Sequence, residues 1–231
     1  MEHGRLILAI DTCGPAGSVA LGRLPGRDLE ILGQTELAGR TYSAMLVSAV
    51  ADLLRSAGVE LADLGGIVAV NGPGSFTGVR VGLSAVKGLA ESAGIPVVAI
   101  SRLEVLSRKS GVPSAALNAH RNEVFLRLER VGSAAKEMLA GARELATIDP
   151  APVRVAVCDD EAAAILRAAW PKTQLVMTAP PMAADTLRIG EGRLVAGAVV
   201  DLALLDGHYL RRSDAEIFGP DADANGESAR V

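Results

Sequence analysis

A short apolar segment that runs directly into a glycine-proline-glycine turn constrains this chain more than any other feature. Residues 67–70 (IVAV) are apolar and mostly β-branched, which is typical of a strand buried on both faces. Residues 72–74 (GPG) end that strand, because proline lacks a backbone N–H donor and glycine adopts angles closed to other residues. Ser75 or Thr77 then offers an oxygen that can cap a helix over residues 77–93. The sequence therefore predicts a strand, a glycine loop and a helix in direct succession.

Other strands and helices are predicted on both sides of this unit. The first half reads as strands 6–10, 18–22 and 29–32, helix 42–57, strand 67–70, helix 77–93, strand 97–100 and helix 103–107. The second half reads as strands 115–119, 124–128 and 153–157, an ambiguous segment 134–148, and helices 159–169 and 183–194. Because strands that alternate with helices pair in parallel, while the opening meander pairs antiparallel, we expect mixed α/β sheets flanked by helices. We predict subdomains over residues 1–109 and 110–212, and a disordered tail over 213–231.

Composition limits the classes of function. The chain has 231 residues, of which only 3% are aromatic, so its core must be aliphatic. A net charge of −4 argues against a protein that binds nucleic acid by itself, since such proteins need a basic surface. Two cysteines, and no apolar segment long enough for a signal peptide or a membrane span, favour a cytoplasmic location without membrane attachment.

The glycine loop can be interpreted in two ways. A strand, a glycine loop and a helix start can bind an anion through backbone N–H groups and the helix dipole, and a carboxylate at a strand end can position a metal-phosphate group. The residues that would contact a nucleotide or another anion are Asp11, Thr12, Gly72, Gly74, Ser75 and Thr77. However, the lysine of a P-loop is missing. A purely structural turn, with Asp11 in an Asx-type turn, therefore remains the alternative.

No catalytic constellation stands out in the sequence. The histidines, His3, His120 and His208, are far apart, and there is no C-x-x-C pair and no G-x-S-x-G motif. Cys13 and Cys158 are best interpreted as buried or half-buried filler residues. We therefore expect no metal site and no catalytic residue within the chain.

The predicted second helix carries two glycines, Gly82 and Gly88, that lower its intrinsic stability. Each costs about 1 kcal/mol relative to alanine. Close approach of another helix would offset this cost. That helix can belong to the same chain or to a partner, and the pattern does not decide between them.

Several of these segments resemble one known family. They are residues 7–12, 18–21, 87–90, 94–98 and 101–104, the block G-P-G-S-F-T-G-x-R-x-G over 72–82, residues 118–125, which resemble a D-A-R-x-x-E-V-Y segment, and residues 209–211, Y-L-R. Together they resemble the bacterial TsaB (YeaZ) family of tRNA threonylcarbamoyladenosine biosynthesis. The resemblance is strong over residues 6–129 and weak from there to Tyr209.

This resemblance implies an actin-like ATPase fold, of the sugar kinase and heat-shock type, with two similar subdomains. It also implies a non-catalytic scaffold that pairs with the paralogue TsaD, recruits the ATPase TsaE, forms a homodimer when alone and meets tRNA only through the complex. No cofactor is expected on the chain alone, and ATP or ADP is expected, if anywhere, at the complex interface.

The first two long helices form the partner contact in that family. Carried over to this chain, the interface residues are Tyr42, Met45, Leu46, Ala49, Val50, Leu53, Gly78, Arg80, Val81, Leu83 and Ser84. The chain departs from the family pattern at Tyr42, where histidine is common, at Asn118, which replaces the aspartate of D-A-R, and at Cys13, which replaces serine. These departures bear on ligand contacts more than on the interface.

Two other functions compete with the scaffold hypothesis. Asp11, Thr12 and the glycine loop suit an autonomous ATP-binding phosphotransferase of the same fold. A glycoprotease-like metallopeptidase is the third hypothesis, and the lack of paired histidines speaks against it.

Overall fold

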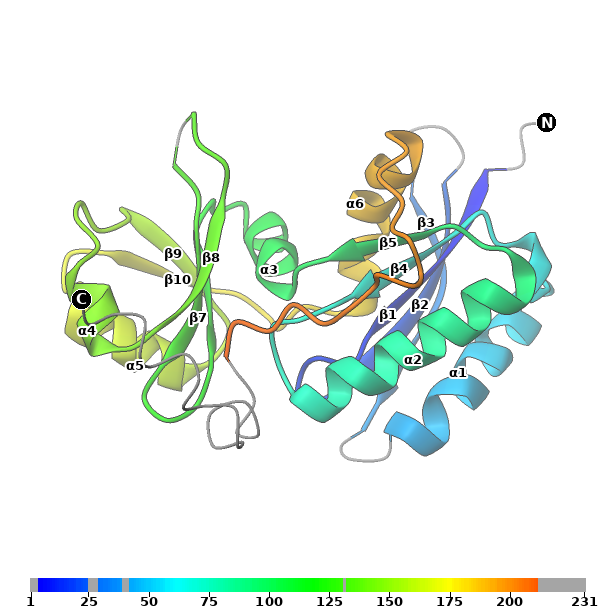
Figure 1. The fold of residues 1–231 in the computed structure, drawn as a ribbon, viewed down its shortest axis with the longest axis horizontal. Coiled ribbons are helices and arrows are strands. Elements are labelled where there is room, and N and C mark those ends of the chain that lie inside the picture. The colour runs from blue at the N-terminus through cyan, green and yellow to red at the C-terminus, as the bar shows by residue number, and fades with distance from the viewer. Residues whose placement is uncertain (1–3, 25–28, 39–41, 131, 212–231) are drawn as a thin grey trace, which may run out of the picture.

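Two five-stranded sheets of the same design form the frame of the molecule (Figure 1). The computed structural model describes residues 4–24, 29–38, 42–130 and 132–211. The predicted tail, residues 213–231, lies outside the described residues, and so does the side chain of Tyr42.

The first sheet has the strand order β3-β2-β1-β4-β5. Its strands are β1 (Arg5–Asp11), β2 (Gly17–Leu24), β3 (Glu30–Leu37), β4 (Gly66–Val70) and β5 (Val97–Ile100). The first three pair antiparallel, and β4 joins both β1 and β5 in parallel. The predicted meander and parallel extension are therefore confirmed.

The second sheet repeats this plan in the order β10-β9-β6-β7-β8. Its strands are β6 (Ala115–Asn118), β7 (Val124–Leu128), β8 (Lys136–Ala140), β9 (Arg154–Val157) and β10 (Gln174–Met177). Here too the first three strands in chain order pair antiparallel and the last two pair in parallel. The predicted fold class, two similar α/β subdomains with mixed sheets flanked by helices, is thus confirmed.

Helices cover both faces of the first sheet. On one face lie α1 (Tyr42–Ala57) and α2 (Phe76–Ala93), and their apolar stripes pack on the sheet in the larger core cluster. The short 3₁₀ turn η2 (Leu61–Asp63) connects α1 to β4. On the other face lies α6 (Ala183–Val195), which contacts β1, β2, β4 and β5. Figure 1 shows α1 and α2 below the first sheet and α6 above it.

The second sheet is covered by α4 (Ala142–Ala146) and α5 (Asp160–Ala169) on its outer side, and by α3 (Arg102–Ser110) on the other. The ambiguous segment 134–148 contains one strand and one helix, β8 and α4. Strand β10 has no counterpart in the sequence prediction.

The two halves exchange their third helices. Helix α3 follows the last strand of the first sheet but packs on β6, β7 and β9, whereas α6 follows the second sheet and packs on the first. The segment after α6 stays with the first half, because the backbone N–H of Val200 bonds to Val97 and that of His208 to Asn71. The subdomain boundaries 1–109 and 110–212 stay a prediction, and α3 and α6 each pack on the sheet that lies across that boundary. The apolar faces of α3 and α6 each pack on the sheet formed by the other half of the sequence, and the order of elements along the chain does not reveal this.

Candidate functional site

The predicted anion contacts at Asp11 and Thr12 are used within the protein. Asp11 ends β1 and is 1% exposed; its Oδ1 accepts the N–H of Cys13 at 2.8 Å, and its Oδ2 accepts Nε of Arg102 at 3.2 Å. The Thr12 hydroxyl donates to the carbonyl of Gly78 at 2.6 Å. Each oxygen of Asp11 therefore accepts a hydrogen bond from within the chain, and the carboxylate forms a buried ion pair with Arg102.

The glycine block packs against the turn that follows β1. A Cβ on Gly74 would lie 2.1 Å from the carbonyl oxygen of Cys13, and a Cβ on Gly78 would lie 2.0 Å from that of Thr12. Gly82 is equally tight against the Thr12 side chain. Here the close approach that glycine permits takes place inside the chain. At Gly88, in contrast, a Cβ would meet nothing within 4 Å.

The start of α2 matches one of the two predicted caps. Ser75 is the N-cap, with its hydroxyl accepting the backbone N–H of Gly78 at 3.2 Å, and the backbone N–H of Ser75 donates to Cys13. Thr77 lies exposed in the first turn. Gly72 needs glycine for another reason, because its φ is +116° and a Cβ would press on the backbone of His208.

Most of the predicted interface residues on α1 belong to the protein's own core. Leu46, Ala49, Val50 and Leu53 are at most 9% exposed and pack on the first sheet, so only Met45 of the predicted α1 residues with a described side chain is exposed. An apolar helical stripe buries itself first against its own sheet. On α2, Gly78 and Leu83 are likewise buried, Val81 is half-buried, and Arg80 and Ser84 are exposed.

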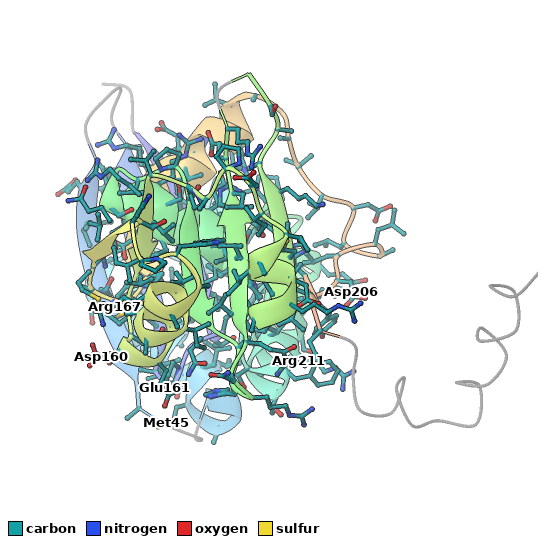
Figure 2. The ribbon with its side chains drawn as sticks, turned by 90° about the vertical axis from the view of Figure 1, so that its left-hand side faces the viewer. Met45, Asp160, Glu161, Arg167, Asp206 and Arg211 are labelled. Carbon is teal, nitrogen blue, oxygen red and sulfur yellow. The ribbon has the colours of Figure 1, made fainter. Side chains whose placement is uncertain are left out.

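A different set of α1 and α2 residues forms the outer surface of these helices, and we call it the α1–α2 face. Its members are exposed and mostly small: Ala44, Met45, Val47, Ser48 and Ala51 on α1, and Thr77, Arg80, Ser84 and Gly88 on α2. Met45 and Val47 are 50% and 56% exposed. Figure 2 shows Met45 pointing outward at the lower end of the molecule.

A cavity of about 950 Å³ lies between the two sheets, and we call it the central cavity. Its walls come from the turn after β1, the start of α2, the ends of β6 and β9, and the segment after α6. Phe76 and Tyr209 contact each other in its wall, with ring centroids 4.8 Å apart and ring planes tilted by 46°. The guanidinium of Arg80 lies 3.9 Å from the centre of the Phe76 ring. Arg102, Cys13 and Cys158 also line it.

The loop from β6 to β7 borders this cavity in a strained conformation. His120, Arg121 and Asn122 all have positive φ, at 59°, 56° and 62°. This left-handed region of backbone conformation is energetically unfavourable for residues other than glycine. Asn118 braces the loop by accepting the N–H of His120 at 2.7 Å, and Arg211 donates to the carbonyl of Ala119 at 2.7 Å.

Further contacts anchor both ends of that loop. Asn118 and Glu161 are joined by a side-chain hydrogen bond, and Arg211 and Glu123 by an ion pair. In Figure 2 Glu161 and Arg211 lie at the same end of the molecule. Asn118, a departure from the family pattern, is therefore a structural brace here.

Both cysteines are held as neutral thiols. Burial, and next the charge of Asp11, raise the pKa of Cys13 well above its usual value, and its thiol donates to the carbonyl of Val70. Burial also raises the pKa of the half-buried Cys158. Burial would lower the pKa of Arg102, but the charge of Asp11, its hydrogen bond to Arg102 and the two nearby cysteines together raise it. Arg102 is therefore a permanent cation.

A second polar cluster connects the halves on another side. Glu137 of β8 accepts hydrogen bonds from Ser101 at 2.6 Å, from Arg127 at 2.8 Å and from His208 at 2.9 Å. Burial would raise the pKa of Glu137, but these hydrogen bonds lower it. Because Ser101 and His208 lie on the first half and Glu137 on the second, this cluster ties the two halves together.

Within residues 4–24, 29–38, 42–130 and 132–211, no three His, Cys, Asp or Glu side chains are grouped as metal ligands. No helix of these segments is long and apolar enough to cross a membrane.

Comparison with known proteins places the chain in a family. Residues 33–149 match the family model described as TsaD, tRNA N6-adenosine threonylcarbamoyltransferase. The tRNA threonylcarbamoyladenosine biosynthesis protein TsaB of Escherichia coli is 37% identical to this chain over 125 residues, which is 52% of each of the two chains. An uncharacterised protein of Mycobacterium tuberculosis is 30% identical over 161 residues, 69% of this chain and 74% of that one. The structure of YeaZ from Pseudomonas aeruginosa superposes with a TM-score of 0.68 at 25% identity, covering 89% of this chain and all of that one. The chain belongs to the TsaB/YeaZ family.

These matches confirm the fold, although the sequence match to the curated TsaB relatives spans only about half their length. Component A of the (R)-2-hydroxyglutaryl-CoA dehydratase of Acidaminococcus fermentans shares the fold with a TM-score of 0.50 at 10% identity, over 83% of this chain and all of that one. The actin-like ATPase fold predicted for a TsaB/YeaZ member is therefore confirmed. Arg102 is a site residue that the sequence analysis did not identify. The only signal for it was its position next to Ser101 in the family-like segment 101–104.

Proposed function

We propose that this chain is a non-catalytic subunit of tRNA threonylcarbamoyladenosine biosynthesis that binds a TsaD homologue through the α1–α2 face. Its similarity to TsaB proteins supports the process. TsaE recruitment, a homodimer in the absence of TsaD, contact with tRNA only through the complex, nucleotide at the complex interface and a cytoplasmic location belong to the same proposal.

The observation that carries the choice of surface is Gly88. It lies exposed inside α2, where a Cβ would touch nothing in the chain. Glycine there costs about 1 kcal/mol relative to alanine, and the fold gains nothing from it, unlike at Gly78 and Gly82. Ser84, one turn before Gly88 on α2, and Ser48 and Ala51 on the exposed side of α1 are small as well. Such a surface lets a partner helix approach closely, and the exposed Met45 and Val47 supply apolar area.

The experiment is complementation of a strain that lacks this gene, with tRNA threonylcarbamoyladenosine measured by mass spectrometry. We expect the native chain to restore the modification and the double variant Ala51→Arg, Ser84→Arg to fail, because two long cations block close approach. Ala168→Arg is the matched control, since Ala168 is an exposed small residue on α5 in the other half. Full modification in the deletion strain would remove the proposed process. Full rescue by the double variant would remove the surface.

A further inference from the structure

Arg102 presents unused hydrogen-bond donors to the central cavity. Arg102 is 6% exposed, and its Nε donates a hydrogen bond to Asp11. Within the described residues, Nη1 and Nη2 of Arg102 have no hydrogen-bond acceptor. Unlike Nε of Arg127, which is fully buried without a partner, these two nitrogens are not fully buried. A guanidinium held rigidly by a buried carboxylate, with its outer nitrogens open to a cavity, is prepared to bind an anionic group.

The rest of the polar lining favours the same charge. Asp159 is the acidic residue in the lining, and its oxygens are occupied, because they accept the backbone N–H groups of Ala162 at 2.7 Å and Asn118 at 3.2 Å. The N-terminus of the 18-residue helix α2, at Ser75 and Phe76, opens on the cavity and adds a partial positive charge. Arg211 lies in the lining as well, already paired with Glu123.

The remaining wall suits an apolar or planar body. Phe76 and Tyr209 lie in tilted contact on one side, and Leu117, Phe125 and Val79 add to the apolar lining. The volume, about 950 Å³, is within the range of small-molecule sites.

The strained loop gives separate support. Three successive non-glycine residues with positive φ, His120 to Asn122, are retained at the cavity border by the Asn118 and Arg211 braces. Such strain is kept mainly where a site requires a particular shape.

We infer that the central cavity binds a small amphiphilic anion, with Arg102 holding a carboxylate or phosphate group and the Phe76–Tyr209 wall covering an apolar body. The cavity adjoins the α1–α2 face only at the first turn of α2, where Arg80 lies over the Phe76 ring. The inference does not rest on the proposed function.

The test compares two fluorescent probes that share an aromatic body. 8-Anilinonaphthalene-1-sulfonate carries an anionic group, and N-phenyl-1-naphthylamine does not. We expect the full chain to bind both, and the charge-free variant Asp11→Asn, Arg102→Gln to bind the sulfonate about tenfold more weakly, since charge-assisted hydrogen bonds are lost. Binding of the neutral probe should change little. The matched control Arg23→Gln, Glu30→Gln removes an ion pair outside the cavity and should leave both affinities unchanged. Unchanged sulfonate binding, or equal weakening of both probes, overturns the inference.

A second arm needs no mutation and identifies the head group. 3-Phenylpropionate, phenyl phosphate and 3-phenylpropanol compete with the bound sulfonate probe on the native chain. Displacement by either anion but not by the alcohol supports the site, and the stronger anion names the head group. Displacement by none of them, or by the alcohol equally well, contradicts it.

Discussion

Asp11 at the end of β1 and Arg102 at the start of α3 form a buried ion pair between residues 91 positions apart. Their side chains are 2% and 7% exposed. Since α3 packs on the second sheet, this pair fixes the point where the chain leaves the first sheet for the second. The sequence suggested two roles for Asp11, contact with a metal-phosphate group or an Asx-type turn, and in the structure its carboxylate pairs with Arg102.

Removing one partner of this pair should be costly. Arg102→Ala leaves a buried carboxylate uncompensated, and we expect a loss of about 3–5 kcal/mol in the free energy of unfolding. Asp11→Asn, Arg102→Gln keeps the shape without either charge and should recover more than half of that loss. Urea unfolding followed by circular dichroism measures both, and equal stability of Arg102→Ala and the native chain would refute the structural role of the pair.

Two glycines of α2 should respond in opposite ways to the same substitution. Gly82→Ala places a Cβ 2.2 Å from the Thr12 hydroxyl oxygen, and we expect a loss of about 1–3 kcal/mol from overpacking. Gly88→Ala meets open space and should raise the stability of the isolated chain by roughly 0.5–1 kcal/mol. Thermal unfolding of the two variants is the measurement, and a stabilising Gly82→Ala would show that the turn after β1 is not packed tightly on α2.

The Glu137 cluster should contribute to the loss of stability in acid. The folded state lowers the pKa of Glu137, so its carboxylate stabilises the protein above the pKa of the unfolded chain. This contribution disappears as the pH falls through the lowered pKa. We therefore expect Glu137→Gln to be less stable than the native chain near neutral pH, with the difference shrinking in acid. A pH series of urea unfolding curves tests this, and a constant difference would contradict it.

The two thiols should differ in reactivity. Cys13 is 2% exposed and Cys158 is half-buried, and burial raises the pKa of both. We expect Ellman's reagent to modify Cys158 slowly in the native protein and Cys13 only after unfolding. Cys158→Ser should abolish native-state labelling. Rapid modification of Cys13 would show that the turn after β1 opens readily.

The sequence predicts most local structure because the decisive signals are local. Three such signals are the apolar stripe of α1, Ser75 as the N-cap of α2 and the continuous apolar sequence of β4, and each lies within one short segment. The exchange of α3 and α6 escapes prediction, since either helix can bury its apolar side on either sheet and only the three-dimensional arrangement decides.

The candidate site is predictable only in part for the same reason. The small-residue pattern of α2 correctly indicates close approach, but not that Gly78 and Gly82 meet Thr12 while Gly88 faces outward. Asp11 stands out in the sequence as a carboxylate at a strand end, whereas its partner Arg102 lies 91 residues away and is marked only by its place in the family-like segment 101–104.

The central claim, that the α1–α2 face binds a TsaD homologue, is tested most directly by mass in solution. Light scattering after size-exclusion chromatography would be performed on the chain alone and mixed with the TsaD homologue of the same organism. We predict a homodimer that is replaced by a heterodimer, both lost in Ala51→Arg, Ser84→Arg and both kept in Ala168→Arg. A heterodimer that forms equally well with the double variant, or a chain that stays monomeric in both samples, would contradict the account.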